Sequence, residues 1–273
     1  MGGTAVRWRD RKSGVLVLRS LVVIVGLLMW EFLPKIAWLR NLSAIFDPFF
    51  VSSPSLVFAR VVDLATGSDG QASMWSYLLD TLMGTFIGVT IGTLLGAFLG
   101  LLLSNSPSLQ RVFAPFVTIL NATPRIALIP IFVILFGPTL TASVVTVVAV
   151  VFFIVFYNAY AGGISVPVQT VQNVRLLGAT SGEVMRRVRL PYVIVWTFTS
   201  LPNAISFGLV AAVTAEILTG KVGMGRLLLN SISNVDSTLT FAVVVVLSVV
   251  GVVLVTVADR IQRRALHWWE RSL

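Results

Sequence analysis

Residues 78–103 read LLDTLMGTFIGVTIGTLLGAFLGLLL, an apolar stretch with a single charged side chain, Asp80. A helix needs roughly 20 apolar residues to cross the hydrocarbon core of a bilayer, so this stretch can span a membrane. Its glycines recur at every fourth position and therefore share one helix face: Gly84, Gly88, Gly92, Gly96 and Gly100. Small residues at this spacing let helices approach closely in lipid. We predict a tight packing seam on this face, in preference to a pore-lining role.

Hydrophobic residues dominate the whole chain. They make up 56% of the 273 residues, and only 11% are charged, whereas a soluble domain carries roughly 25% charged residues. At roughly 20 residues per helical crossing, the chain has room for about five to seven crossings. Cysteine is absent, which excludes disulfides and thiolate metal sites. The composition predicts an all-α membrane protein with short loops.

Apolar runs separated by charged or turn-forming segments predict six transmembrane helices. The third run, at about 110–136, is interrupted by Pro115, Pro124, Arg125 and Pro130, so we predict a broken segment instead of one straight helix. The other five are predicted at about 15–33, 78–103, 139–161, 191–216 and 237–258.

These runs divide the chain into three regions. Residues 1–77 are predicted to hold a cytoplasmic N-terminus, the first transmembrane helix and an external loop. In that loop, Ser53-Pro54-Ser55 predicts an N-cap and the start of a short interfacial helix. Residues 78–260 are predicted to form a five-helix core that includes an internal loop at 162–190, and residues 261–273 a cytoplasmic tail.

Basic residues lie at the edges of apolar runs. Arg7, Arg9 and Arg11 precede the first run, and Arg260 and Arg263 follow the last. Such flanks are typical of chain ends that stay on the cytoplasmic side of a membrane. The net charge of +9 therefore reflects topology. We expect no nucleic-acid partner, which would need a basic soluble face with interleaved aromatic residues.

Catalytic and nucleotide-binding motifs are not expected in this chain. Thr219-Gly220-Lys221 resembles the end of a phosphate-binding loop, but Val222 follows it and no glycine lies five residues before Gly220. There is no histidine pair with metal spacing and no Gly-x-Ser-x-Gly run to expose a nucleophile. We predict a protein that is not an enzyme and binds no metal or cofactor itself.

Carboxylates within the predicted membrane spans are scarce. Asp80 and Glu216 lie near helix ends, and Glu31 and Asp259 lie at boundaries. A carrier driven by protons or sodium ions usually depends on ionisable groups within the membrane. We therefore predict that energy enters from outside this chain.

The internal loop is the most informative feature. Two helical pieces, at about 167–177 and 181–188, are predicted to be joined by the turn Gly178-Ala179-Thr180. A helix, a glycine turn and a second helix form a rigid projection that a soluble partner can grip. Gly178 is predicted to serve both as a helix C-cap and as the docking turn.

This loop resembles a known signature. Arg175-Leu176-Leu177-Gly178-Ala179-Thr180, followed by Val188-Arg189-Leu190-Pro191, is similar to the coupling helix of binding-protein-dependent ABC importer permeases. That signature has Glu-Ala-Ala, three residues, a glycine, nine residues and Ile-x-Leu-Pro, and the glycine-to-proline spacing matches. The departure is Gln172-Asn173-Val174 in place of Glu-Ala-Ala, which removes an acidic contact.

Further motifs extend the resemblance to the nitrate, sulfonate and taurine group of these permeases. In chain order they are Pro54-Ser55-Leu56-Val57, residues 124–130 through Phe136-Gly137, Asn158 with Gly162, Ala215-Glu216-Ile217, Gly223-Met224-Gly225 and residues 260–264. Their joint order and spacing carry the resemblance, because each motif alone is common.

The resemblance implies an importer-permease (MetI-like) fold with a cytoplasmic coupling helix, in the bacterial plasma (inner) membrane. It implies a second permease copy or paralogue, cytoplasmic ATPase subunits that hold Mg-ATP, and an external solute-binding protein that delivers a small solute. The group handles sulfonates, nitrate, pyrimidine precursors, flavins and aromatic acids. The implied ATPase-coupling residues are Gln172, Arg175, Leu176, Leu177, Gly178, Ala179, Thr180, Leu190 and Pro191.

Candidates for the translocation path are Pro124, Arg125, Pro130, Asn158 and Glu216. The prolines interrupt the regular helical backbone. Within a membrane, irregular backbone is tolerated only beside protein or a water-filled cavity. Arg125 is either an attraction for anions or a snorkelling arginine at a helix break, and we prefer the second interpretation.

Two other classes of function stay open on the sequence alone. One is an ion-coupled secondary transporter or channel, and the other is a membrane scaffold without transport. The sequence does not decide between a homodimer and a heterodimer of permeases.

Overall fold

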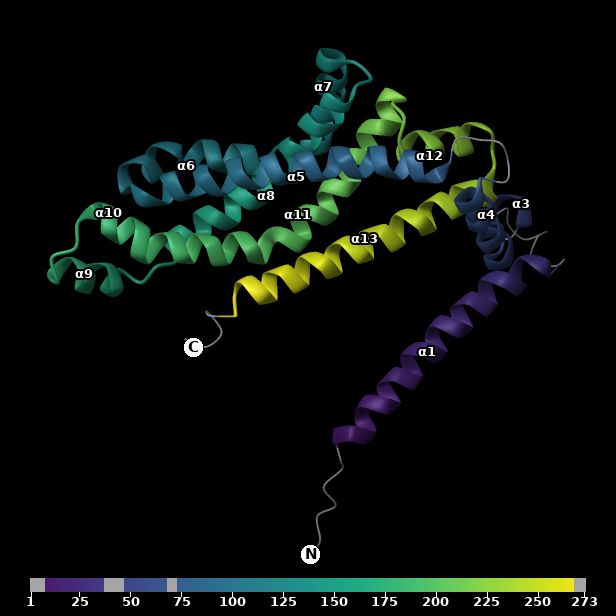
Figure 1. Cartoon of the computed structure of the whole chain (residues 1–273), viewed down its shortest axis with the longest axis horizontal. Coiled ribbons are helices and arrows are strands. Elements are labelled where there is room, and N and C mark those ends of the chain that lie inside the picture. Colours follow the sequence, from purple (N-terminus) through teal and green to yellow (C-terminus); the bar gives the residue numbers. More distant parts are fainter. Residues whose placement is uncertain (1–7, 37–46, 68–72, 268–273) are drawn as a thin grey trace, which may run out of the picture. The chain divides into compact units, whose positions relative to one another are not determined.

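The computed structural model describes residues 8–36, 47–67 and 73–267, which are mostly helical (Figure 1). The chain divides into two compact units. The smaller unit comprises Met1–Gln71 with Ser231–Val244, and the larger comprises Ala72–Asn230 with Val245–Leu273. The helices of the larger unit are α5 (Met74–Asn105), α6 (Pro107–Ala122), η3 (Arg125–Leu128), α7 (Ile129–Phe136), α8 (Leu140–Ile164), α9 (Val168–Leu176), α10 (Ser181–Val184), η4 (Met185–Arg189) and α11 (Leu190–Thr219). Two further helices, α12 (Met224–Ser233) and α13 (Ser237–Ala265), have residues in both units.

Three long helices, α5, α8 and α11, pack against one another and form the core of the larger unit. The glycine face of α5 lies against α8. A Cβ atom added at Gly88 would lie 2.5 Å from the Val147 Cβ, and one at Gly96 would lie 2.8 Å from the Phe152 carbonyl oxygen. All five glycines of this face are buried. The predicted packing seam is confirmed.

Valines of α8 fill the space beside the seam. Val147, Val151 and Val155 are fully buried, and Ala212 of α11 packs into the same cluster. A glycine on α11, Gly208, brings that helix close to α5, because an added Cβ would lie 2.8 Å from the Val89 side chain. Dense packing of small and branched residues makes this core resistant to deformation.

The third predicted crossing is broken, as the prolines indicated. Helix α6 ends at Ala122, a short 3₁₀ turn covers Arg125–Leu128, and α7 begins at Ile129. Pro115 lies inside α6 without ending it, whereas Pro130 lies in the first turn of α7. Within the described residues, five helices are long and apolar enough to cross a membrane: Gly14–Lys35, Met74–Asn105, Leu140–Ile164, Ser181–Thr219 and Ser237–Ala265. Helices α6 and α7 together occupy the place of the remaining predicted crossing.

The predicted start of the fifth crossing near Pro191 agrees with the structure, because α11 begins at Leu190 and Pro191 lies in its first turn. Before Leu190 the helical backbone continues back to Ser181 without a break. A π-helical turn at Met185–Arg189 lies just before the proline. Proline lacks an N–H and its ring collides with the carbonyl four residues earlier in a regular α-helix, so a wider turn there accommodates Pro191. The second helical piece of the internal loop is therefore the first part of this long helix.

The smaller unit contains α1 (Trp8–Phe32), η1 (Leu33–Lys35), α3 (Pro48–Val51), α4 (Pro54–Thr66) and the first residues of α13. Helix α4 begins at Pro54, as predicted, but the Ser53 side chain does not cap it. Glu31 of α1 replaces that cap, because its carboxylate accepts hydrogen bonds from the Ser55 N–H and the Ser55 hydroxyl, both at 3.1 Å. The cap comes from 24 residues away, which local sequence cannot reveal.

Candidate functional site

The internal loop projects a sharply defined turn between α9 and α10. Gly178 has a φ of +89°. Its N–H donates to the Arg175 carbonyl at 2.9 Å, and the Ala179 N–H donates to the Val174 carbonyl at 3.2 Å. This pair of hydrogen bonds, with glycine in the left-handed region, is the Schellman motif that ends a helix. The prediction that Gly178 is a C-cap is confirmed.

The turn is fixed on its other side by a capping box. The Glu183 N–H donates to the Thr180 hydroxyl at 3.3 Å, while the Thr180 N–H donates to the Glu183 carboxylate at 2.9 Å. These reciprocal bonds satisfy donors at the start of α10. Two caps within six residues give the turn one defined backbone conformation.

Two exposed leucines lie at the apex of the turn. Leu176 is 86% exposed and Leu177 is 87% exposed. Fully burying a leucine side chain is worth roughly 1.5–3 kcal/mol, so the pair offers a partner an apolar contact on a rigid frame.

The structure separates the predicted coupling residues into two groups. Gln172, Arg175, Leu176, Leu177, Gly178, Ala179 and Thr180 lie together at the turn, and all except the half-buried Ala179 are exposed. Leu190 and Pro191 lie half-buried in the first turn of α11, at the base of the loop.

Arg189 at that base is a residue that the sequence reasoning missed. Its guanidinium donates through Nη1 to the Ser104 carbonyl at the end of α5. The Gln110 side chain of α6 donates to the same carbonyl at 2.7 Å. The available signal was its position as the last charged residue before the apolar run that ends at Glu216.

The candidate path residues lie on several elements. Pro124 and Pro130 flank η3 and are exposed, and the side chain of Arg125 lies outside the described part of the structure. Asn158 is half-buried on α8, where its side-chain amide donates to the Ile154 carbonyl of the same helix at 2.8 Å. Their role in a path stays a prediction.

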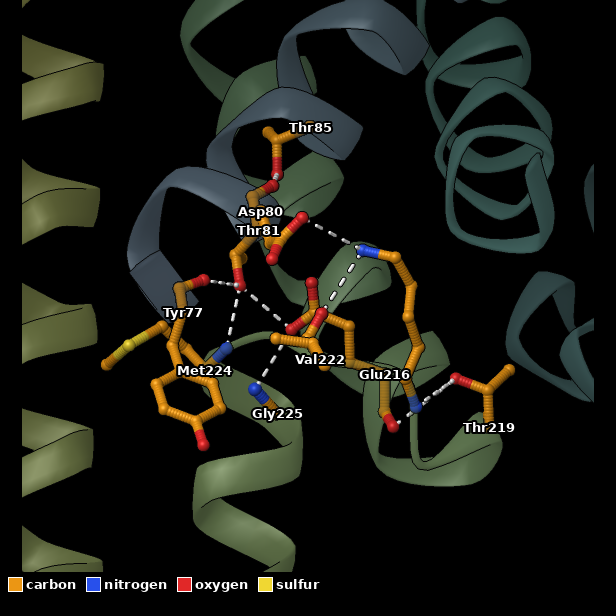
Figure 2. A network of polar contacts seen from close by, with 10 residues as sticks. Tyr77, Asp80, Thr81, Thr85, Glu216, Thr219, Val222, Met224 and Gly225 are labelled. Atoms are coloured by element: carbon orange, nitrogen blue, oxygen red, sulfur yellow. Dashed lines mark hydrogen bonds and ion pairs between the residues drawn. The ribbon is translucent and has the colours of Figure 1, made fainter. Parts of the chain in front are cut away.

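Glu216, the fifth candidate, lies in a buried polar network near the end of α11 (Figure 2). Its Oε2 accepts hydrogen bonds from the Thr81 hydroxyl of α5 and from the Gly225 N–H of α12, both at 2.9 Å. The Met224 N–H donates to the Thr81 hydroxyl at 2.8 Å. A carboxylate at this position satisfies the orphan Gly225 N–H and complements the positive end of α12.

The backbone around this carboxylate is closely fitted. A Cβ atom added at Gly223 would lie 2.3 Å from the Glu216 Cδ, and one at Gly225 would lie 2.4 Å from the Val213 carbonyl oxygen. Lys221 lies beside the network, with its ammonium 3.7 Å from the Asp80 carboxylate. The network brings together two of the motifs noted in the sequence, Ala215-Glu216-Ile217 and Gly223-Met224-Gly225, and fastens α11, α12 and α5 to one another.

Comparisons with known proteins agree with this architecture. The family model described as "Binding-protein-dependent transport system inner membrane component" matches residues 88–267. The chain is 27% identical over 224 residues to the riboflavin transport system permease protein RibX of Chloroflexus aurantiacus, with 82% of each chain covered. It is 23% identical over 265 residues to the taurine transport system permease protein TauC of Escherichia coli, with coverage of 96% and 94%.

Solved structures share the fold. The MetNI methionine ABC transporter in an inward-facing conformation gives a TM-score of 0.61 at 19% identity, covering 70% of this chain and 95% of that chain. An amino acid ABC transporter solved with histidines gives a TM-score of 0.58 at 22% identity, covering 80% and 98%.

Proposed function

The chain belongs to the family of binding-protein-dependent transport system inner membrane components and is therefore a permease subunit of an ABC importer; we propose how it is coupled to its ATPase partners and which class of solute it carries. It is a transport subunit and not an enzyme. Its family implies ATPase and solute-binding protein partners.

The turn at residues 175–180 is the proposed ATPase-docking element. The single observation that carries this proposal is the exposure of Leu176 and Leu177 on a doubly capped turn. Flexible loops that bind a partner lose conformational entropy on binding, whereas a pre-formed turn loses little. The loss of the acidic residue at Gln172 leaves these leucines as the principal contact of the turn.

The proposed transport cycle has two states. When ATP closes the ATPase pair, the docked turn moves with it and two permease subunits rock to open a central path outward, and hydrolysis resets them. Nucleotide binding drives this change only if the ATPases bind the two permease states with different free energies. Both chain ends lie on the cytoplasmic side in this scheme, since basic residues flank the first and last apolar runs.

The proposed solute is a small organic or inorganic anion or an aromatic, vitamin-like compound. Relatives of this chain are named for transport of riboflavin, taurine, formylaminopyrimidine and nitrate. Selection among these rests largely with the solute-binding protein, as the family resemblance implies.

Recovery of partners from native membranes tests the docking proposal. Gly178→Trp places a bulky side chain at a left-handed position on the turn, and Gly67→Trp is the matched control, because Gly67 also has a positive φ of 71° and open space around it. We expect the wild type and the Gly67 variant to retain an ATPase and the Gly178 variant to lose it. Retention by all three would contradict the docking role.

Uptake measurements separate the importer from the ion-coupled alternative. We expect uptake to stop when the partner ATPase carries a catalytic mutation, and to continue with an uncoupler when ATP is maintained. A carrier driven by ions would show the opposite pattern, and a scaffold would show no uptake.

A further inference from the structure

We propose that Arg189 is a positioning residue that makes α5 follow the coupling loop, through its hydrogen bond to the Ser104 carbonyl. This inference rests on the proposed docking function of the loop. It concerns the step after docking, in which movement of a cytoplasmic turn must reach the transmembrane helices.

Arg189 occupies a special place in the helix that leaves the loop. It is the last residue of the π-helical turn at Met185–Arg189, immediately before α11. A π turn contains an extra residue and changes the direction of the side chains beyond it, and such turns occur often at functional sites. Its neighbours Arg186 and Arg187 are exposed, whereas Arg189 is half-buried and reaches back to α5.

The acceptor of this hydrogen bond is the end of a helix. Ser104 lies in the last turn of α5, where carbonyl groups lack partners within the helix. A cation near the negative end of a helix is favourable. Gln110 of α6 bonds the same carbonyl, so α5, α6 and the π turn meet at one oxygen atom.

The start of the internal loop, at the end of α8, also packs against Ser104. Ser104 is fully buried, and a Cβ atom added at Gly163, near the end of α8, would lie 1.9 Å from the Ser104 hydroxyl oxygen. The loop therefore leaves α8 beside Ser104 and re-enters the membrane domain at Arg189, which is bonded to Ser104.

An apolar hollow of about 260 Å³ lies beside this contact. It is lined from α5 by Ala97, Phe98 and Leu101, and from α11 by Leu190, Val193, Ile194, Thr197 and Phe198. Because a hollow separates the two helices there, the Arg189 hydrogen bond is a direct polar link between their ends at the loop. Without it, the loop and the first turn of α11 can move while the cytoplasmic end of α5 stays behind.

The arrangement is costly for a purely structural contact. The Nε atom of Arg189 is buried and has no hydrogen-bond partner among the described residues. A buried charged group with an unsatisfied donor destabilises a fold unless other contacts compensate. The cost is consistent with a contact kept for transmission of movement.

The test uses the absence of cysteine, which makes site-specific labelling direct. Spin labels are placed at Gly182→Cys in the loop and Leu99→Cys on α5, both exposed positions of the larger unit. The permease is purified with its ATPases, and the distance between labels is measured without nucleotide and with Mg-ATP and vanadate. Arg189→Met removes the hydrogen-bond donors and keeps an apolar stem, Arg189→Lys keeps a cationic donor, and Arg186→Met is the exposed control.

We expect one label distance in both nucleotide states for the wild type and the Arg186 variant, because α5 follows the loop. In Arg189→Met, a second label distance should appear with Mg-ATP and vanadate, from molecules in which α5 does not follow the loop. The ratio of molecules in which α5 follows the loop to those in which it does not should fall about tenfold, as the loss of one charge-assisted hydrogen bond predicts. Arg189→Lys should restore the wild-type distance. A single unchanged distance in Arg189→Met overturns the inference, as does a second distance already present without nucleotide, which would mark a merely structural role. If the wild type retains no ATPase, the docking proposal itself fails.

Discussion

The glycine seam between α5 and α8 provides a test in which two identical substitutions on one helix face should have opposite effects. A Cβ atom at Gly84 would meet its nearest neighbour, Ser143 Cβ, at 3.5 Å, an ordinary contact distance. One at Gly96 would lie 2.8 Å from the Phe152 carbonyl oxygen and 2.9 Å from the Phe156 nitrogen. These are backbone atoms and cannot rotate away. Gly84→Ala and Gly96→Ala therefore differ only in the space that the new methyl group meets.

The expected magnitudes follow from two opposing effects. Replacing a helical glycine by alanine favours the helix by roughly 0.5–1 kcal/mol. At Gly84 this effect acts alone and should stabilise the protein. At Gly96, α5 and α8 must separate by roughly 0.6 Å to reach ordinary contact at 3.4 Å, and such overpacking costs about 1–3 kcal/mol. The gain in helix propensity is common to both variants, so their difference is the overpacking cost.

Thermal denaturation of the detergent-solubilised chain measures this difference. A change of 1 kcal/mol shifts the midpoint by about 2–4 °C for a domain of similar size, so the two variants should differ by roughly 2–12 °C, with wild type between them. Gly100→Ala should behave like Gly96→Ala, because its Cβ would lie 2.6 Å from the Ala159 Cβ and 2.8 Å from the Tyr160 nitrogen. Equal midpoints for the Gly84 and Gly96 variants would refute the close approach of the two helices.

Two further predictions concern the polar caps. Glu216→Ala leaves the buried Gly225 N–H without its acceptor, so the free energy of unfolding should fall by about 1–3 kcal/mol. Glu216→Gln keeps an oxygen acceptor, so its free energy of unfolding should fall less. Equal thermal midpoints for the two variants in detergent would contradict this account. Thr180→Val removes the hydroxyl that caps α10 and should weaken that helix start by about 1 kcal/mol. Limited trypsin digestion should then cleave after Arg186 faster than in wild type, and an unchanged rate would show that the cap does not hold the turn.

Local patterns in the sequence predicted those features that depend on neighbours along the chain. The four-residue glycine period located the seam, the prolines located the break before α7, and the glycine of the internal loop located the end of α9. Each of these depends on helix periodicity or on the backbone preference of a single residue type. Such preferences act within one or two helical turns, so the structures that they favour can be predicted directly from the sequence.

Features that depend on distant partners were not predicted. Glu31 caps α4 across 24 residues, Arg189 reaches Ser104 across 85, and Glu216 bonds Thr81 across 135. The π turn at Met185–Arg189, which joins the second helical piece of the loop to α11 without a break, was not predicted either.

The packing of the core constrains where the transport movement can occur. Close backbone approach along the α5–α8 seam, and close packing of Gly208 of α11 against the Val89 side chain, leave these three helices little room to slide within one subunit. Tightly packed interfaces switch between discrete arrangements and do not deform gradually. In the proposed transport cycle, movement that begins at the docking turn therefore shifts the three-helix core as one body, provided that α5 is held at its cytoplasmic end. The compliant element beside this core is the irregular backbone between α6 and α7, where Thr123–Leu128 interrupt the third crossing. In the proposed cycle, the path opens at this break while the packing of the rigid core beside it is preserved.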